Sequence, residues 1–227
     1  MKIGILQTGH APDALIATSG DYDQMFRDLL GGHGFTFETW AVVDEAFPPG
    51  PEAADGWLIT GSRHGAYEDL PWIAPLERLI RDIQASGQPM IGVCFGHQVI
   101  AQALGGKVEK FAGGWAVGRT EYDMGGRRAT LNAWHQDQVT QAPETARVLG
   151  RNAFCENAML AYGDSIWTVQ AHPEYDTGFI RGLIETRGRG NVPDAILERA
   201  QAGLDGPVNN AEMAEFMAEF LKKKERA

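Results

Sequence analysis

The first half of the sequence alternates short apolar runs with amphipathic stretches, and this alternation is its strongest constraint on the fold. Apolar runs at 2–9, 35–42, 56–62 and 89–93 are predicted strands, and helical patterns occupy most of the intervals between them. Apolar strands that alternate with helices are typical of a parallel sheet covered on both faces. We therefore expect an α/β protein.

The second half changes character. Between 107 and 172 the sequence consists mostly of short strand-like runs separated by turn residues, which predicts a small antiparallel extension of the sheet. Helical patterns return at about 176–187, 193–203 and 209–224, and the KKKER tail is predicted to be the solvated end of the last helix. We find no internal repeat or long linker. We expect one domain over 1–227, with its C-terminal helices at about 193–224.

Composition narrows the classes of function and the compartment. The formal net charge is −10, which argues against nucleic acid as a partner because phosphates need a basic surface. No apolar run reaches the roughly 18 residues of a membrane span, and the N-terminus reads directly into a strand instead of a secretion signal. Two cysteines cannot form a disulfide framework, so we expect a cytoplasmic protein without membrane or nucleic-acid partners.

Cys94 lies between Gly92 and Gly96, where an apolar strand gives way to a helical pattern. The order Gly-x-nucleophile-x-Gly at such a junction is typical of a sharp turn that exposes a reactive side chain above the sheet. The glycines fit because a Cβ would crowd this turn. The following helix N-terminus favours a thiolate and a neighbouring oxyanion. We expect Cys94 to be a nucleophile.

A thiol nucleophile needs a base, and His172 is the best of the six histidines. It ends an apolar strand and is followed by Pro173 and Glu174. In extended backbone, residues two apart point to the same side, so Glu174 could accept a hydrogen bond from one imidazole nitrogen while the other faces Cys94. Both would lie at carboxyl ends of parallel strands, where ligand sites of α/β proteins form.

The motifs GVCFGHQ (92–98) and HPE (172–174), after an early ITGS strand and turn (59–62), resemble those of the class I glutamine amidotransferases. The resemblance covers about 40–180. It is closest to the glutaminase portion of GMP synthase and its stand-alone relatives. It implies a flavodoxin-like α/β fold and a Cys-His-Glu triad of Cys94, His172 and Glu174. The oxyanion donors it implies are the backbone N–H groups of Gly61 and Phe95.

The resemblance also implies substrate-binding residues. Gln98, four positions after the cysteine, matches the residue that contacts glutamine in the family. Trp134, His135 and Gln136 match the segment that binds the α-amino and α-carboxylate groups of the substrate. The substrate would be L-glutamine or another γ-glutamyl compound.

Two departures from GMP synthase bear on the reaction. The loop after the third strand reads Gly61-Ser62-Arg63 where GMP synthase usually has Gly-Gly-Pro, and this version resembles stand-alone relatives that include plant γ-glutamyl peptidases. The chain also has no room for an ATP-pyrophosphatase domain and no Walker loop. Any synthetase that uses ammonia would therefore be a separate subunit acting in trans.

Other features read as structural. Cys155 lacks a glycine frame and is expected to be a small buried residue. The histidines and cysteines are too dispersed for metal-ligand spacing, so we expect no metal and no cofactor. Trp115 could line a substrate pocket or pack in the core, and the sequence leaves that choice open.

Three hypotheses follow. The first is hydrolysis of the γ-glutamyl amide of glutamine through a thioester, releasing glutamate and ammonia. The second keeps the chemistry but changes the substrate to small γ-glutamyl peptides or conjugates. The third is a non-catalytic, partner-binding module that retains only the fold, and the intact Cys94, His172 and Glu174 set argues against it.

Overall fold

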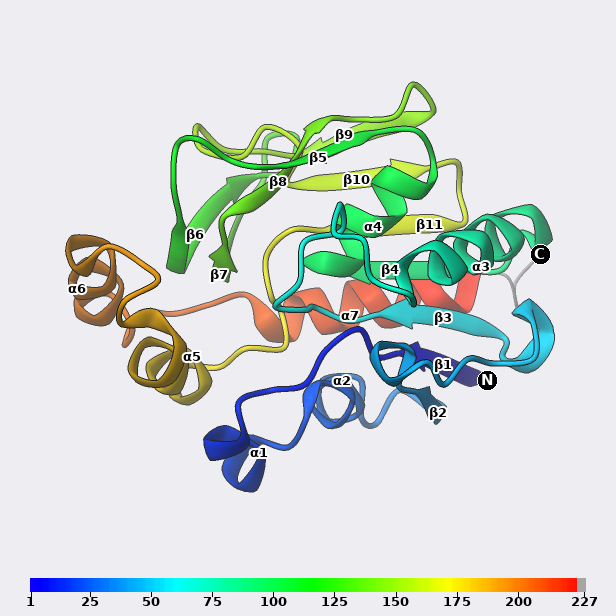
Figure 1. Cartoon of the computed structure of the whole chain (residues 1–227), viewed down its shortest axis with the longest axis horizontal. Helices are drawn as coiled ribbons and strands as arrows, with labels where there is room; N and C mark the ends of the chain where they lie inside the picture. The colour runs from blue at the N-terminus through cyan, green and yellow to red at the C-terminus, as the bar shows by residue number, and fades with distance from the viewer. Residues whose placement is uncertain (224–227) are drawn as a thin grey trace.

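The computed structural model describes residues 1–223 and centres on a seven-stranded sheet (Figure 1). The strand order is β2-β1-β3-β4-β11-β10-β9. The first five strands in this order are parallel. Because β11 is the fifth of these strands along the chain, their order is 2-1-3-4-5, which is the order of flavodoxin-like folds. Their bounds are β1 (Lys2–Leu6), β2 (Thr36–Trp40), β3 (Gly56–Ile59), β4 (Met90–Val93) and β11 (Ile166–Val169).

Helices cover both faces of the sheet, as the apolar strands predict. On one face, α3 (Ile73–Ser86) and α4 (Phe95–Ala103) pack over β1, β3 and β4. On the other face, α2 (Tyr22–Leu29) and α7 (Asn210–Leu221) cover the opposite side chains of the same strands. The expected α/β class is confirmed.

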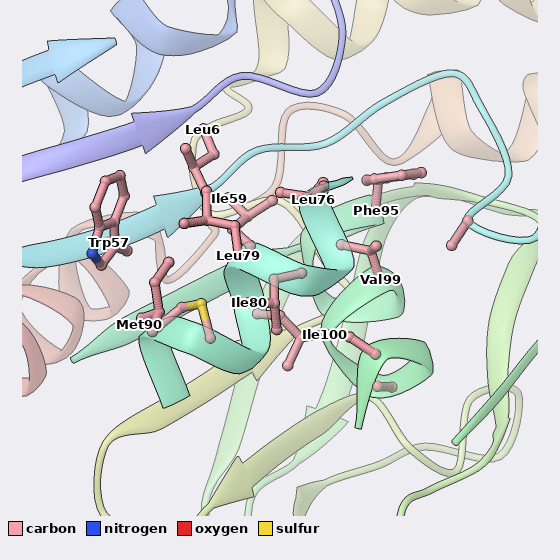
Figure 2. Packing of buried hydrophobic residues seen from close by; sticks show 14 of the residues in the cluster. Leu6, Trp57, Ile59, Leu76, Leu79, Ile80, Met90, Phe95, Val99 and Ile100 are labelled. Carbon is pink, nitrogen blue, oxygen red and sulfur yellow. The ribbon is translucent and has the colours of Figure 1, made fainter. Parts of the chain in front are cut away.

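Figure 2 shows why α3 lies on the sheet. Its apolar side chains recur at helical spacing, and Leu76 and Ile80 are fully buried beside Ile59 of β3 and Met90 of β4. Burial of each such side chain contributes about 1.5–3 kcal/mol to folding. Phe95, the first residue of α4, is buried in the same cluster, so the helix that follows Cys94 is held against β3 and β4.

The antiparallel part divides into three pieces. The strands β10 (Met159–Tyr162) and β9 (Ala146–Gly150) extend the main sheet beyond β11, as expected. The other four strands form two separate two-stranded ribbons, because their partners lie only within each ribbon. One ribbon pairs β5 (Lys107–Lys110) with β8 (Asp137–Gln141), and the other pairs β6 (Ala116–Asp123) with β7 (Arg128–His135).

Two of the remaining helices lie at the same end of the molecule as the β6–β7 ribbon (Figure 1). The expected helix at 176–187 is present as α5 (Thr177–Leu183), which continues into a π-helix, η3 (Ile184–Gly188). Next comes α6 (Asp194–Ala202), close to the predicted 193–203. The predicted helix at 209–224 begins and ends near the bounds of α7, but residue 224 and the end of the KKKER tail lie outside the described residues.

Three short helices were not expected from the sequence. The helix α1 (Asp13–Ser19) buries no side chain fully, so its pattern carries little helical signal. The other two are single 3₁₀ turns, η1 (Val42–Asp44) and η2 (Pro51–Ala53). Among all the helices of residues 1–223, none combines the length and the apolar character needed to cross a bilayer.

Candidate active site

Cys94 occupies a strained turn between β4 and α4. Its backbone has φ 53° and ψ −103°, a conformation that costs a non-glycine residue about 1–3 kcal/mol. The flanking glycines are required by close contacts. A Cβ on Gly96 would lie 2.3 Å from the carbonyl oxygen of Ile59, and a Cβ on Gly92 would lie 2.6 Å from the backbone of Gly96. The strain is therefore held in place by tight packing around the turn.

His172 is brought to Cys94 by the pairing of two neighbouring strands. β4 and β11 are parallel, and the N–H of Cys94 donates to the carbonyl of Val169 at 2.9 Å, at the end of the ladder. Three residues later, the N–H of His172 donates to the carbonyl of Asn132 in β7 at 2.8 Å. The backbone of His172 is thus fixed on both sides, beside the turn that carries the thiol.

The imidazole of His172 lies between a carboxylate and a thiol. Its Nδ1 is 2.6 Å from Oε1 of Glu174, and the Cys94 side chain lies close enough to affect its pKa. His172 and Glu174 are both almost fully buried. Burial by itself would lower the pKa of His172, but the charges and hydrogen bonds of Glu174 and Cys94 outweigh it and raise that pKa to about 10. The arrangement favours an imidazolium beside the thiol.

Two backbone N–H groups beside the thiol are free. Within residues 1–223, neither the N–H of Gly61 nor that of Phe95 donates to another protein group. A Cβ on Gly61 would lie 3.0 Å from Cε1 of His172 and 3.7 Å from Cβ of Cys94, so Gly61 faces both side chains. Phe95 directly follows Cys94 at the start of α4. Unpaired N–H groups in this position can bind a developing oxyanion.

A cavity of about 480 Å³ opens onto Cys94 and His172. Four more of the predicted site residues line it, namely Gln98, Trp134, His135 and Gln136. Gly61, Phe95 and Glu174 are not in the lining, but Glu174 contacts Nδ1 of His172, Gly61 faces His172 and Cys94, and Phe95 follows Cys94 in the chain. The structure therefore gathers every predicted site residue in or next to one cavity.

Gln98 and His135 are both held by the first residue of β8. Nε2 of Gln98 donates to the carbonyl of Asp137 at 2.9 Å and to Oε1 of Gln170 at 3.1 Å. Nδ1 of His135 lies 3.2 Å from the carbonyl of Asp137. Burial lowers the pKa of His135 to about 3, so its imidazole is neutral near pH 7. Both side chains are thus fixed and uncharged where they meet the cavity.

Several cavity residues were missed by the sequence analysis. The ring of Tyr175 stacks on His172, and Tyr22 and Arg187 lie beyond it. Tyr175 directly follows the HPE motif, which is the only local signal that could have singled it out. The sequence does not decide whether Trp115 lines a pocket or packs in the core. In the structure it is half-buried and lines the cavity together with Trp134.

Cys155 and His97 lie outside the cavity lining. Cys155 is buried, and its burial raises the pKa of its thiol to about 12. His97 is fully buried with Nδ1 2.8 Å from the hydroxyl of Thr168. In the described part of the chain, no group of three or more His, Cys, Asp and Glu side chains is placed to hold a metal ion.

A protein-family model described as "Glutamine amidotransferase class-I" matches residues 48–180, more than half of the chain. The chain belongs to this family. It is 32% identical over 213 residues to gamma-glutamyl peptidase 4 of Arabidopsis thaliana, covering 86% of this chain and 85% of the relative. It is also 32% identical to gamma-glutamyl-L-1-hydroxyisopropylamide hydrolase of Pseudomonas sp, over 77% of this chain and 67% of that one. These names agree with an enzyme of the glutamine amidotransferase and hydrolase type.

Solved structures of the family share the fold. A glutamine amidotransferase from Methylobacillus flagellatus superposes with a TM-score of 0.74 at 22% identity, covering 97% of this chain and 91% of that chain. A glutamine amidotransferase from Thermotoga maritima gives a TM-score of 0.70 at 20% identity, covering 98% of this chain and 97% of that chain. The flavodoxin-like expectation is thus supported by both strand order and whole-chain similarity.

Proposed function

We propose that the protein hydrolyses the γ-glutamyl amide bond, with Cys94 as nucleophile, His172 as general acid and base, and Glu174 as the carboxylate that orients His172. The observation that carries this proposal is the placement of the Cys94 thiol. It sits on a strained turn, next to a buried His172–Glu174 pair and beside the free N–H groups of Gly61 and Phe95.

In the first half-reaction, the thiolate of Cys94 attacks the γ-carbonyl carbon of the substrate. The carbonyl oxygen becomes an oxyanion that the N–H groups of Gly61 and Phe95 stabilise. The imidazolium of His172 then donates its proton to the amide nitrogen. The C–N bond breaks, the amine leaves, and a γ-glutamyl thioester remains on Cys94.

In the second half-reaction, His172 is neutral and acts as a base. It takes a proton from water, and the resulting hydroxide attacks the thioester carbon at the same oxyanion site. The C–S bond breaks to release glutamate, and the thiolate of Cys94 and the imidazolium of His172 are restored. Glu174 stabilises the charged imidazole in both halves through its contact with Nδ1.

Gln98 and the segment from Trp134 to Gln136 would hold the amino acid end of the γ-glutamyl group. Oε1 of Gln98 accepts no hydrogen bond from the described residues, and Gln98 lines the cavity, so this oxygen can receive the α-amino group. The neighbouring backbone at the end of β7 would supply the remaining polar contacts. These roles rest on the cavity lining and on the family resemblance.

The names of the relatives agree on the bond but differ in the amine that leaves. Gamma-glutamyl peptidase 4 and the hydroxyisopropylamide hydrolase are named for substrates larger than glutamine. The chain also matches GMP synthase (glutamine-hydrolyzing) of Azoarcus sp., at 33% identity over 89% of this chain but 42% of that protein. We therefore keep two candidate substrates, glutamine with ammonia passed to a synthetase in trans, and γ-glutamyl peptides or conjugates.

Mass spectrometry of products from glutamine and a panel of γ-glutamyl compounds tests the proposal. We expect wild-type protein to release glutamate from at least one of them, and we expect Cys94→Ser to release none. Intact-mass analysis after rapid acid quench should show a γ-glutamyl adduct on the wild type only. Equal turnover by wild type and Cys94→Ser would overturn the proposed mechanism.

A further inference from the structure

The cavity wall beyond His172 is built largely from residues outside the span that the family model matches. Tyr22, Arg187 and Asn191 line the cavity, and all three fall outside residues 48–180. Tyr22 begins α2 and Arg187 lies in the π-helix η3. A π-helix is a frequent feature of functional sites. This part of the wall therefore lies outside the shared family core.

A chain of contacts joins this wall to the imidazole. Nη1 of Arg187 donates to the hydroxyl of Tyr22 at 3.2 Å, and the rings of Tyr22 and Tyr175 lie with their centroids 6.3 Å apart. The ring of Tyr175 stacks on His172 with the centroids 3.9 Å apart. The wall thus lies on the His172 side of the thiol. Gln98 and Asp137 form a separate set of contacts on another part of the lining.

This position matches the departing amine and not the glutamyl group. His172 gives its proton to the leaving nitrogen, so the amine departs next to the imidazole. The glutamyl end extends instead towards Gln98 and the end of β7. A substituent on the amine would therefore lie along Tyr175, Tyr22 and Arg187.

Arg187 carries a charge that the described residues leave unpaired. Its guanidinium donates to two neutral oxygens, the Tyr22 hydroxyl and the carbonyl of His10, the latter from Nη2 at 2.9 Å. Among residues 1–223 it forms no ion pair, although it is only half-exposed and lines the cavity. Three of its five N–H donors remain free, and a guanidinium binds carboxylates with paired hydrogen bonds.

The arginine is also held in position. Nδ2 of Asn191 donates to the carbonyl of Arg187 at 3.0 Å. Next to it, a Cβ on Gly188 would lie 3.4 Å from the ring of Trp134, so the tryptophan is close to this segment. Trp134 in turn packs edge to face with Trp115, with centroids 6.3 Å apart. An anchored cation thus stands beside a half-exposed aromatic pair.

We propose that this wall is a leaving-group subsite for an amino acid with a free α-carboxylate and an apolar side chain. Arg187 binds the carboxylate, and Trp115 contacts the apolar side chain. The preferred substrate class is then γ-glutamyl dipeptides of this kind, in preference to glutamine or neutral γ-glutamyl amines. The inference rests on the proposed function, because it assigns the amine side of that same reaction.

Two matched substrates test it. γ-Glutamyl-phenylalanine and γ-glutamyl-phenethylamine differ only in the carboxylate of the leaving group. We expect wild-type kcat/KM to favour the dipeptide by about 10- to 100-fold, as a charge-assisted hydrogen bond implies. Arg187→Met should reduce this ratio to near one, and Arg187→Lys should restore part of it. Arg189→Met, which removes an exposed charge two residues away and outside the cavity lining, should keep the wild-type ratio.

A second arm tests the aromatic pair. Trp115→Ala should reduce the preference for γ-glutamyl-phenylalanine over γ-glutamyl-alanine. If the wild type hydrolyses the dipeptide and the amine equally well, or if Arg187→Met leaves their ratio intact, the subsite is wrong while γ-glutamyl hydrolysis stands. If glutamine is hydrolysed and neither matched substrate is, the subsite is again wrong. If the wild type hydrolyses no γ-glutamyl compound, the proposed function falls and the subsite falls with it.

Discussion

The ring of Tyr175 lies face to face on the imidazole of His172, with centroids 3.9 Å apart and the two planes 4° from parallel. Glu174 contacts Nδ1 at one edge of the same imidazole. Tyr175 in turn packs against Phe179, with the two ring centroids 4.5 Å apart. The orientation of His172 is therefore set both by a hydrogen bond in the ring plane and by an aromatic face. The two constraints can be separated by mutation.

Tyr175→Phe keeps the aromatic face and loses only the hydroxyl, so we expect kcat to stay within about 10-fold of wild type. Tyr175→Leu removes the face and should lower kcat by roughly 100-fold, since small errors in orientation are costly to catalysis. Steady-state kinetics on both variants would test this. A positioning role predicts that KM changes little. Equal losses in the two variants, with matching losses of melting temperature, would indicate a role in packing alone.

Cys94→Ala and Cys94→Ser should lower kcat by at least about 10⁴-fold while the fold survives. A glutamine-derived chloromethyl ketone should alkylate Cys94 and spare Cys155, because Cys155 is buried and its thiol has a raised pKa of about 12. Peptide mapping after labelling measures this directly. Labelling of Cys155 alone would show that the nucleophile has been misassigned.

His172→Ala should also lower kcat by about 10⁴-fold or more, because both proton transfers are lost. Glu174→Gln should be about 10- to 100-fold less damaging, since the imidazole remains but is poorly oriented. Rates of glutamate release would rank the two variants. A loss in Glu174→Gln as large as that in His172→Ala would favour a structural role for the carboxylate.

The pH dependence follows from the raised pKa of His172. A raised pKa means that the folded protein favours the imidazolium, so leaving-group protonation should persist as pH rises through 6.5 and be lost only in the alkaline range. The stabilisation that His172 contributes is likewise full below pH 6.5 and is lost as pH rises through its folded pKa. In the Glu174→Gln variant, the alkaline decline of kcat/KM should begin at lower pH than in the wild type. If the decline does not move, a group other than His172 causes it.

Gly61→Ala tests the contact between Gly61 and the imidazole of His172. The added Cβ would lie 3.0 Å from Cε1 of His172, so the ring must shift. We expect a loss of about 100-fold in kcat with a small change in melting temperature. Gly203→Ala is a matched control, because its Cβ would meet the nearest backbone oxygen at an ordinary 3.6 Å. Similar kinetics in the two variants would contradict the proposed position of Gly61.

Substrate analogues test recognition of the glutamyl end. Asparagine should fail because one missing methylene moves its amide away from Cys94. Glutaric acid monoamide lacks both α-substituents, and it should be a poor substrate because polar groups of the site would be left unpaired. Comparable rates on asparagine and glutamine would refute both candidate substrates.

Cell extract tests whether a synthetase acts in trans. If one does, addition of the extract should raise the glutaminase rate, whereas the rate of a self-sufficient peptidase should not change.

The part of the site that the sequence predicts is the part encoded locally. The glycines around Cys94 mark a turn whose geometry any reader of the sequence can anticipate, and the spacing of His172 and Glu174 follows from extended backbone. The strand–helix alternation likewise predicts the parallel sheet. The separation of the two antiparallel ribbons from the main sheet is harder to predict, because it depends on which strands pair with each other in the folded protein.

The residues that escaped prediction are placed by long-range packing. Tyr22 and Arg187 come from opposite ends of the sequence and meet only because α2 and η3 pack together in one cluster at the edge of the cavity. No spacing or motif links them. The clash that requires Gly96 is also remote, since it comes from the carbonyl of Ile59 on a neighbouring strand.

Cys94 and His172 are far apart in the chain and meet only through the pairing of β4 with β11. While the polypeptide is being synthesised, Cys94 emerges from the ribosome long before β11 exists. On the proposed mechanism, its thiol then lacks its base, His172. On the proposed mechanism, chains that end before His172 therefore carry the cysteine without its base, and γ-glutamyl turnover requires that β11 has been synthesised and has paired with β4.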